Sequence, residues 1–223
     1  YWGLGAPINR KPLKTIMSKK IGWKFDNTYL KLPSLMLSKA DPIPVKNPRT
    51  IIFNQNLSKD IDLNFAEIHD EEIALIFSGN KLPKGSETIS QAYAGHQFGQ
   101  FTILGDGRAT LLGEHLNSKN ERYDIQLKGS GKTPYSRNGD GRAALAPMLR
   151  EYLISEAMHY LNIPSSRSLA VIKTGENIYR RFKEEGSILV RVMKSHIRVG
   201  TFEYASYFGS SEDLKKITSY SIN

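Results

Sequence analysis

One long helical pattern between two groups of short strand-like runs limits the fold more than any other feature of the chain. In residues 143–161 the apolar side chains recur every three or four positions, which predicts a single amphipathic helix that ends before Pro164. Strand-like runs flank it, at 101–104, 109–114 and 123–128 on one side and at 168–173, 178–182 and 188–192 on the other. This order predicts an α+β fold of antiparallel strands and one long helix, not the βαβ alternation of a doubly wound sheet.

Three further segments carry local structural signals. Residues 68–78 have acidic side chains near the start and apolar ones after them, which predicts a short helix closed by Gly79. Residues 174–177, Thr-Gly-Glu-Asn, are typical of a turn between two strands. The proline-rich stretch 26–54 lacks a sustained period, so we expect an extended segment that wraps over the core.

The positive charge of the chain lies mostly near its beginning. The formal net charge is +9, yet residues 1–50 hold ten Lys and Arg against two Asp, whereas the other 173 residues hold 21 basic and 20 acidic side chains. A nearly neutral body without a patterned basic and aromatic platform argues against a nucleic-acid partner. Because Met17-Ser-Lys-Lys resembles a translation start, we expect residues 1–24 to be a non-native or disordered leader.

Cysteine content and hydropathy exclude further classes of protein. The chain has no cysteine, which excludes disulfides, thiolate catalysis and cysteine-ligated zinc, and its five histidines show no close metal-ligand spacing. No apolar run approaches the ~20 residues of a membrane-spanning helix, and no segment is laid out like a secretory signal. We therefore expect a soluble protein that is not exported and has no membrane partner.

Two residues in this framework form a constellation typical of kinases. Lys128 ends a predicted strand, and Glu151 lies near the start of the long predicted helix. In kinases a helix acid holds a strand lysine so that the lysine neutralises nucleotide phosphates beneath a glycine-containing turn. Taken singly, each residue also fits a simpler role, as a surface lysine and as a first-turn glutamate favoured by the helix dipole.

The segment Gly105-Asp106-Gly107-Arg108 offers the glycine-containing turn that this constellation needs. Its glycines let a backbone turn approach a phosphate, and its arginine can pair with one. By itself, a Gly-x-Gly between two strands also fits an ordinary hairpin turn.

A competing phosphate-binding motif fails on its context. Gly129-Ser-Gly-Lys-Thr133 resembles the end of a P-loop, but the full pattern requires glycine where the chain has Gln126, and the segment runs into Pro134 instead of opening a helix. We therefore reject a P-loop, although the segment can still contact phosphate.

Charged residues on both sides of the central strands have open roles. Asp140 precedes the long helix and fits a helix cap. Arg191 and Arg198 flank Lys194 and His196, and they fit either a solvated strand edge or a bidentate grip on a triphosphate.

Longer motifs resemble one protein family closely. They are Gln91-Ala-Tyr-Ala-Gly-His-Gln-Phe-Gly-Gln100, Leu104-Gly-Asp-Gly-Arg-Ala109, Leu127-Lys-Gly-Ser-Gly-Lys-Thr-Pro-Tyr-Ser-Arg137, Gly139-Asp-Gly-Arg-Ala143, Arg150-Glu-Tyr-Leu-Ile-Ser-Glu-Ala157 and Ser195-His-Ile-Arg-Val-Gly-Thr-Phe-Glu-Tyr204. Over about residues 25–210 the chain is thereby similar to the SelO (selenoprotein O, YdiU) family of protein adenylyltransferases. The resemblance implies the N-terminal lobe of a protein-kinase-like fold, with an antiparallel sheet, a long helix and only the beginning of a second lobe.

The resemblance also implies a reaction. ATP lies flipped relative to ordinary kinases, so that AMP passes to Ser, Thr or Tyr hydroxyls of protein substrates and pyrophosphate leaves. Mg²⁺ is the implied cofactor, while Mn²⁺ and UTP stay open as alternatives. The implied location is the bacterial cytoplasm, with the mitochondrion as the alternative.

Matching positions carry the roles that the resemblance implies. Glu151 orients Lys128, and the nucleotide is contacted by Gly105, Gly107, Arg108, Lys128, Asp140, Gly141, Arg191 and Arg198. One departure is mild, because Lys132 stands where the family pattern has arginine.

A second departure concerns the catalytic aspartate and the metal-binding asparagine and aspartate, which the family carries beyond the position of Asn223. We expect an extended segment with short helices at 25–100, a nucleotide-binding lobe at 101–192 and the start of a truncated second lobe at 193–223. We also expect this stretch to be inactive alone, with a poorly supported tail. Two other functions stay open, an ordinary protein kinase and an ATP-binding pseudokinase.

Overall fold

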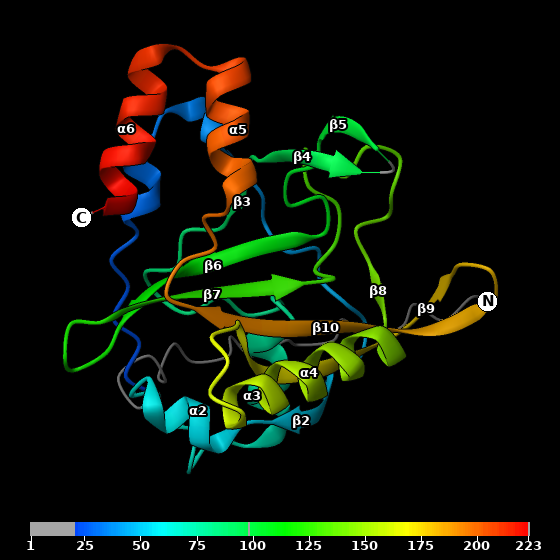
Figure 1. Cartoon of the computed structure of the whole chain (residues 1–223). Helices are drawn as coiled ribbons and strands as arrows, with labels where there is room; N and C mark the ends of the chain where they lie inside the picture. Colours follow the sequence, from blue (N-terminus) through cyan, green and yellow to red (C-terminus); the bar gives the residue numbers. More distant parts are fainter. Residues whose placement is uncertain (1–20, 98, 223) are drawn as a thin grey trace, which may run out of the picture.

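The computed structural model describes residues 21–97 and 99–222, which form an α+β fold around one mainly antiparallel sheet (Figure 1). The strands of this sheet follow the order β1-β3-β6-β7-β10-β9-β2, and β8 pairs with β10 beside that path. Their bounds are β1 Leu37–Lys39, β2 Arg49–Phe53, β3 Ile89–Gln91, β6 Ala109–Leu116, β7 Arg122–Lys128, β8 Ala143–Ala144, β9 Arg167–Tyr179 and β10 Lys183–Met193. This α+β arrangement with a mainly antiparallel sheet is compatible with a protein-kinase-like fold.

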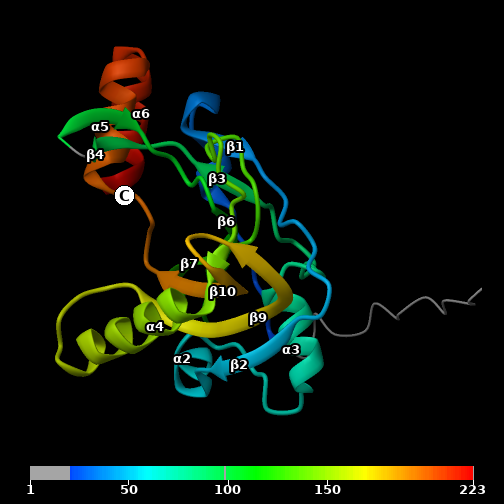
Figure 2. The ribbon, with the colours of Figure 1, turned by 90° about the vertical axis from the view of Figure 1, so that its right-hand side faces the viewer.

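Helices cover both faces of the sheet. Helices α2 (Gln55–Asp60) and α3 (Asp70–Phe77) lie on one face and enclose the larger core, whereas α4 (Leu145–Tyr160) lies on the other face, across β9 and β10 (Figures 1 and 2). The predicted helices at 68–78 and 143–161 are thereby confirmed. Within the described residues, no helix is both long and apolar enough to cross a membrane.

The two-residue period of the central strands decides which side chains face α4. Ile125 and Leu127 of β7 belong to the larger core, as do Ile188 and Val190 of β10. Residues that alternate with them point to the opposite face. Leu189 accordingly packs in a separate cluster with Met148 of α4, and the intervening polar residues of β7 and β10 turn toward the same side.

The apolar stripe of α4 is less buried than its periodicity suggests. Met148 is 2% exposed, but Leu153 and Leu161 are 62% and 67% exposed. The buried side of the later turns is formed instead by Ser155 and Glu156, which are 6% and 8% exposed and contact Ser168 of β9.

The predicted turn at 174–177 is wrong, because β9 runs unbroken through these residues and the hairpin closes at 180–182 instead. Gly175 adopts φ +74°, and a Cβ there would lie 2.6 Å from the Cβ of Asn47. The amide of Asn47 donates to the carbonyl of Thr174. Gly175 is therefore a strand residue that lets the segment around Asn47 approach closely. In the sequence, a glycine at such a position resembles a turn residue.

The expected strand at 101–104 exists but lies outside the main sheet. Strand β5 (Gln100–Ile103) pairs only with β4 (Ala94–Gln97), and this small sheet lies against helix α5 (Val199–Phe208). The proline-rich stretch 26–54 is less extended than expected. It contains two short 3₁₀ helices, at Thr28–Lys31 and Ser34–Met36, and the strands β1 and β2.

The expectation of a poorly supported tail is wrong. Helices α5 and α6 (Ser211–Ile222) stand together beside β4 (Figure 2). Ala205 and Ile217 are fully buried in a second core with Tyr29 and Met36. The expected leader 1–24 also extends too far, because Ile21 is 1% exposed in the larger core. Residues 1–20 lie outside the described part of the chain.

Candidate functional site

A cleft of about 750 Å³ lies where the Gly-Asp-Gly turn, the 135–142 loop, the ends of β7 and β10 and the start of α5 meet. All eight residues for which we expected nucleotide contact line it: Gly105, Gly107, Arg108, Lys128, Asp140, Gly141, Arg191 and Arg198. Sequence positions almost a hundred residues apart are thus brought to one surface.

Basic side chains dominate this cleft. Its lining contains seven of them, Arg108, Lys128, Arg137, Arg142, Arg180, Arg191 and Arg198, and two carboxylates, Asp106 and Asp140. Both carboxylates already face arginines, so the net field of the cleft is positive. Such a cleft attracts polyanions, and guanidinium groups suit the oxygens of phosphates.

Lys128 and Glu151 form the ion pair that the sequence predicts. The Nζ of Lys128, at the end of β7, donates to Oε2 of Glu151, which lies in the second turn of α4. The two side chains are 17% and 27% exposed. Burial and the neighbouring Arg191 lower the pKa of Lys128, and the Glu151 carboxylate opposes this shift.

Arg191 joins the same ion pair from the adjacent strand. Its Nη1 lies 3.5 Å from Oε1 of Glu151, so one carboxylate faces two cations that stand side by side on β7 and β10. Burial lowers the pKa of the Arg191 guanidinium. An arrangement of two cations on one acid retains an excess positive charge, which an anionic ligand can neutralise.

The glycines of the Gly-Asp-Gly turn leave room for Tyr135 to pack against the turn. A Cβ on Gly105 would lie 2.4 Å from the ring of Tyr135, and one on Gly107 would lie 2.7 Å from the Tyr135 carbonyl oxygen. Thr133 Oγ1 donates to the carbonyl of Asp106 at 2.7 Å. The 133–136 segment therefore lies directly against the turn and fixes its shape.

The same loop excludes the P-loop geometry. A P-loop opens a helix, whereas the helix after Gly129-Ser-Gly-Lys-Thr133 begins only at Leu145. Gly131 instead donates from its amide to the carbonyl of Gly141, and a Cβ on Gly141 would lie 2.0 Å from the Gly131 carbonyl oxygen.

Asp140 does not cap the long helix, whose N-cap is Ala144. Its two carboxylate oxygens accept hydrogen bonds from Arg180, each at 2.7 Å, and this contact lowers the pKa of Asp140. Arg180 stands in the turn between β9 and β10. No sequence pattern predicts the contact between Asp140 and Arg180, because 40 positions separate them and the turn of the β9–β10 hairpin lies at 180–182, not at 174–177.

The basic residues of 191–198 do not form one cluster, because only Arg191 and Arg198 line the cleft. Lys194 pairs with Glu121 at 2.9 Å, and His196 Nδ1 lies 3.1 Å from Asp124, away from the cleft. Arg198 turns to the cleft, with its guanidinium carbon 4.0 Å from the centre of the Tyr93 ring. The positions of Arg191 and Arg198 are thus compatible with phosphate binding. Lys194 and His196 instead form contacts that hold the end of β10 and the segment after it.

The donors that a divalent cation prefers do not gather in this part of the chain. Among residues 21–97 and 99–222, no three His, Asp or Glu side chains cluster in a way that could hold a metal ion.

Comparison with known proteins identifies the family of the chain. A family model described as protein adenylyltransferase SelO matches residues 20–223. Curated relatives named protein nucleotidyltransferase YdiU are 56% identical over 202 residues in Pelagibacter ubique, 56% over 212 in Nitrosococcus oceani and 57% over 201 in Brevibacillus brevis. The matches cover 91%, 95% and 90% of this chain but 42%, 43% and 41% of the relatives, so the chain spans less than half of their length. The chain belongs to the SelO family.

Proposed function

We propose that this chain carries the nucleotide-binding lobe of a protein nucleotidyltransferase that transfers AMP from ATP to Ser, Thr or Tyr hydroxyls of proteins. The observation that carries the proposal is the Lys128–Glu151 ion pair at the edge of a cleft lined by seven basic side chains. The family match and the names of the curated relatives support nucleotidyl transfer as the reaction class.

The charges of the cleft suit this reaction. In AMP transfer the acceptor oxygen attacks the α-phosphorus, the bond to the bridging oxygen breaks, and pyrophosphate leaves with the negative charge. Lys128, Arg191 and Arg198 line the cleft, where they would bind the phosphates and stabilise charge on the leaving group. The acceptor proton passes to a base, a role that we assign to none of the described residues.

A divalent cation bound with ATP, Mg²⁺ or Mn²⁺, supplies further neutralisation of the phosphates. The described residues offer no clustered ligand set for such an ion, so we route no step through it. What this chain contributes is the binding and orientation of the triphosphate.

Phosphoryl transfer is the second candidate, because the same Lys–Glu pair serves ordinary kinases. The two reactions differ in which phosphorus is attacked. The test is a transfer assay on the intact protein with a protein acceptor and Mg²⁺, in which α-labelled and γ-labelled ATP are compared. Lys128→Met removes the pair, and Lys173→Met, on the exposed part of β9, is the matched control.

Each outcome of this assay has a distinct meaning. Label from the α position alone, lost in Lys128→Met and kept in Lys173→Met, supports AMP transfer. Label from the γ position alone would make the protein a kinase. Binding of ATP without transfer of either label would make it a pseudokinase.

A further inference from the structure

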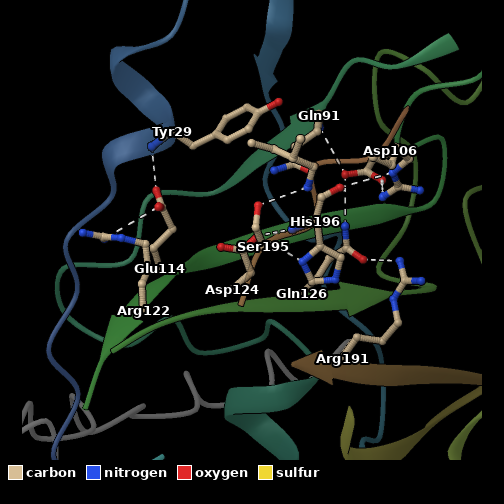
Figure 3. Close-up of polar contacts among 12 residues, drawn as sticks. Tyr29, Gln91, Asp106, Glu114, Arg122, Asp124, Gln126, Arg191, Ser195 and His196 are labelled. Atoms are coloured by element: carbon tan, nitrogen blue, oxygen red, sulfur yellow. Dashed lines mark hydrogen bonds and ion pairs between the residues drawn. The ribbon is translucent and has the colours of Figure 1, made fainter. Parts of the chain in front are cut away.

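Asp106, in the middle of the Gly-Asp-Gly turn, is a buried carboxylate that faces the cleft. It is 3% exposed, and its Oδ2 accepts hydrogen bonds from the amide of Gln91 at 3.2 Å and from Nε2 of Gln126 at 3.0 Å (Figure 3). Its Oδ1 lies 3.9 Å from Nη2 of Arg198. These partners are donors or cations, which fits the ionised carboxylate.

Gln126 extends this contact to the second arginine. Its side chain is fully buried, its Nε2 donates to Asp106, and its Oε1 accepts a hydrogen bond from Nη2 of Arg191 (Figure 3). Because Arg191 also faces Glu151, the partner of Lys128, a continuous series of polar contacts joins all three cations that we place on the phosphates.

We propose that Asp106 and Gln126 are positioning residues that hold the guanidinium groups of Arg198 and Arg191 toward the triphosphate. The inference rests on the proposed function of the cleft, and it concerns residues that would not themselves touch the nucleotide. A long arginine side chain has many rotamers, so a buried partner that fixes its head group lowers the entropy lost on binding.

Asparagine at position 106 separates a packing role from a charged one. Its side-chain oxygen can accept the same two hydrogen bonds, from the amide of Gln91 and from Nε2 of Gln126, but it presents no charge to Arg198. Burial raises the pKa of Asp106, and the Arg198 guanidinium opposes the shift. The Oδ1 of Asp106 lies 3.9 Å from Nη2 of Arg198, so this carboxyl group is placed to influence where the guanidinium group points.

The test measures how much of the binding of ATP depends on its phosphates. Dissociation constants of ATP and adenosine are measured by calorimetry on the intact protein, for wild type, Asp106→Asn and Gln126→Met. We expect Asp106→Asn to weaken ATP about tenfold, or about 1.4 kcal/mol, and adenosine less than about twofold. Gln126→Met should weaken ATP severalfold, and it keeps the test open if Asp106→Asn does not fold.

A matched control and a rescue variant complete the test. Glu114→Gln neutralises another buried carboxylate, which lies 3.6 Å from Arg122 at the opposite end of the same sheet (Figure 3), and it should leave both affinities unchanged. Asp106→Glu keeps a carboxylate at this position and should retain more of the affinity for ATP than Asp106→Asn does.

The outcomes separate this inference from the proposed function. Wild-type protein that does not bind ATP would overturn the proposed function itself. Wild-type binding with an equal loss of ATP and adenosine in Asp106→Asn, or an equal loss of ATP in Glu114→Gln, would overturn the inference alone.

Discussion

The partly buried ion pair between Lys128 and Glu151 should stabilise the fold by a measurable amount. The two side chains are 17% and 27% exposed, between the exposed pairs that contribute roughly 0.2–1 kcal/mol and the buried pairs whose disruption costs about 3–5 kcal/mol. A hydrogen bond between charged groups contributes about 1.5–3 kcal/mol. We therefore expect a coupling energy of about 1.5–3 kcal/mol between Lys128→Met and Glu151→Gln in a double-mutant cycle.

The single variants should differ in a defined order. Lys128→Met leaves Glu151 facing Arg191, whereas Glu151→Gln leaves both Lys128 and Arg191 without a counter-charge. We expect Glu151→Gln to lower the free energy of unfolding more than Lys128→Met, because two desolvated cations then repel each other.

The assay is urea unfolding of the four proteins of the cycle, followed by a signal of native structure. Lys173→Met with Glu185→Gln provides the matched cycle, since this pair has the same residue types but is 33% and 52% exposed on the β9–β10 hairpin. Its coupling should stay below about 1 kcal/mol. Equal coupling in the two cycles, or a larger loss for Lys128→Met than for Glu151→Gln, would show that burial and Arg191 do not strengthen the Lys128–Glu151 pair.

Three further predictions concern the loop, the charge at the cleft and the second core. Asp140→Asn should lower the free energy of unfolding by about 0.2–1 kcal/mol at neutral pH. The difference between the two proteins should shrink as the pH falls below 3.8 and through the lowered folded-state pKa of Asp140, and urea unfolding at several pH values measures it. Gly141→Ala, at φ +68°, should cost at least about 1–2 kcal/mol and weaken ATP binding, whereas Gly139→Ala should cost less, both measured by unfolding and calorimetry. Ile217→Ala should cost about 2–5 kcal/mol and Ile222→Ala, which is 80% exposed, less than about 0.5 kcal/mol, as thermal unfolding would show.

Each of these predictions has a clear contrary result. A difference for Asp140→Asn that grows toward pH 3 would reverse the sign derived from its lowered pKa, because a depressed carboxyl stabilises the fold only when ionised. An equal loss of stability for Gly141→Ala and Gly139→Ala would contradict the close approach of Gly141 to the backbone at Gly131. Equal effects at Ile217 and Ile222 would contradict a packed α6.

The parts of the fold that sequence could predict rest on local periodicity. The long helix and the strand that ends at Lys128 each repeat a pattern within a dozen or so residues, and the kinase-like pairing of Lys128 with Glu151 follows from their order. The eight residues taken from the family motifs share one cleft, although their contacts with a nucleotide stay predictions.

The features that sequence missed depend on contacts between distant segments. Gly175 looks like a turn residue, and only the approach of Asn47 explains it inside a strand. Arg180 reaches the cleft because the β9–β10 hairpin is longer than predicted. The burial of α6 depends on Tyr29, almost two hundred residues earlier, so no window of the sequence contains the reason for it.

We propose that the cationic cleft binds the triphosphate of ATP. A crystal structure of the intact protein with a non-hydrolysable ATP analogue would show where the phosphates lie. We predict the phosphates within about 3 Å of Lys128 Nζ and of the Arg191 and Arg198 guanidinium groups, beside the Gly-Asp-Gly turn. Phosphates bound elsewhere, or a nucleotide in this cleft that leaves the two arginines with their present partners only, would contradict the account.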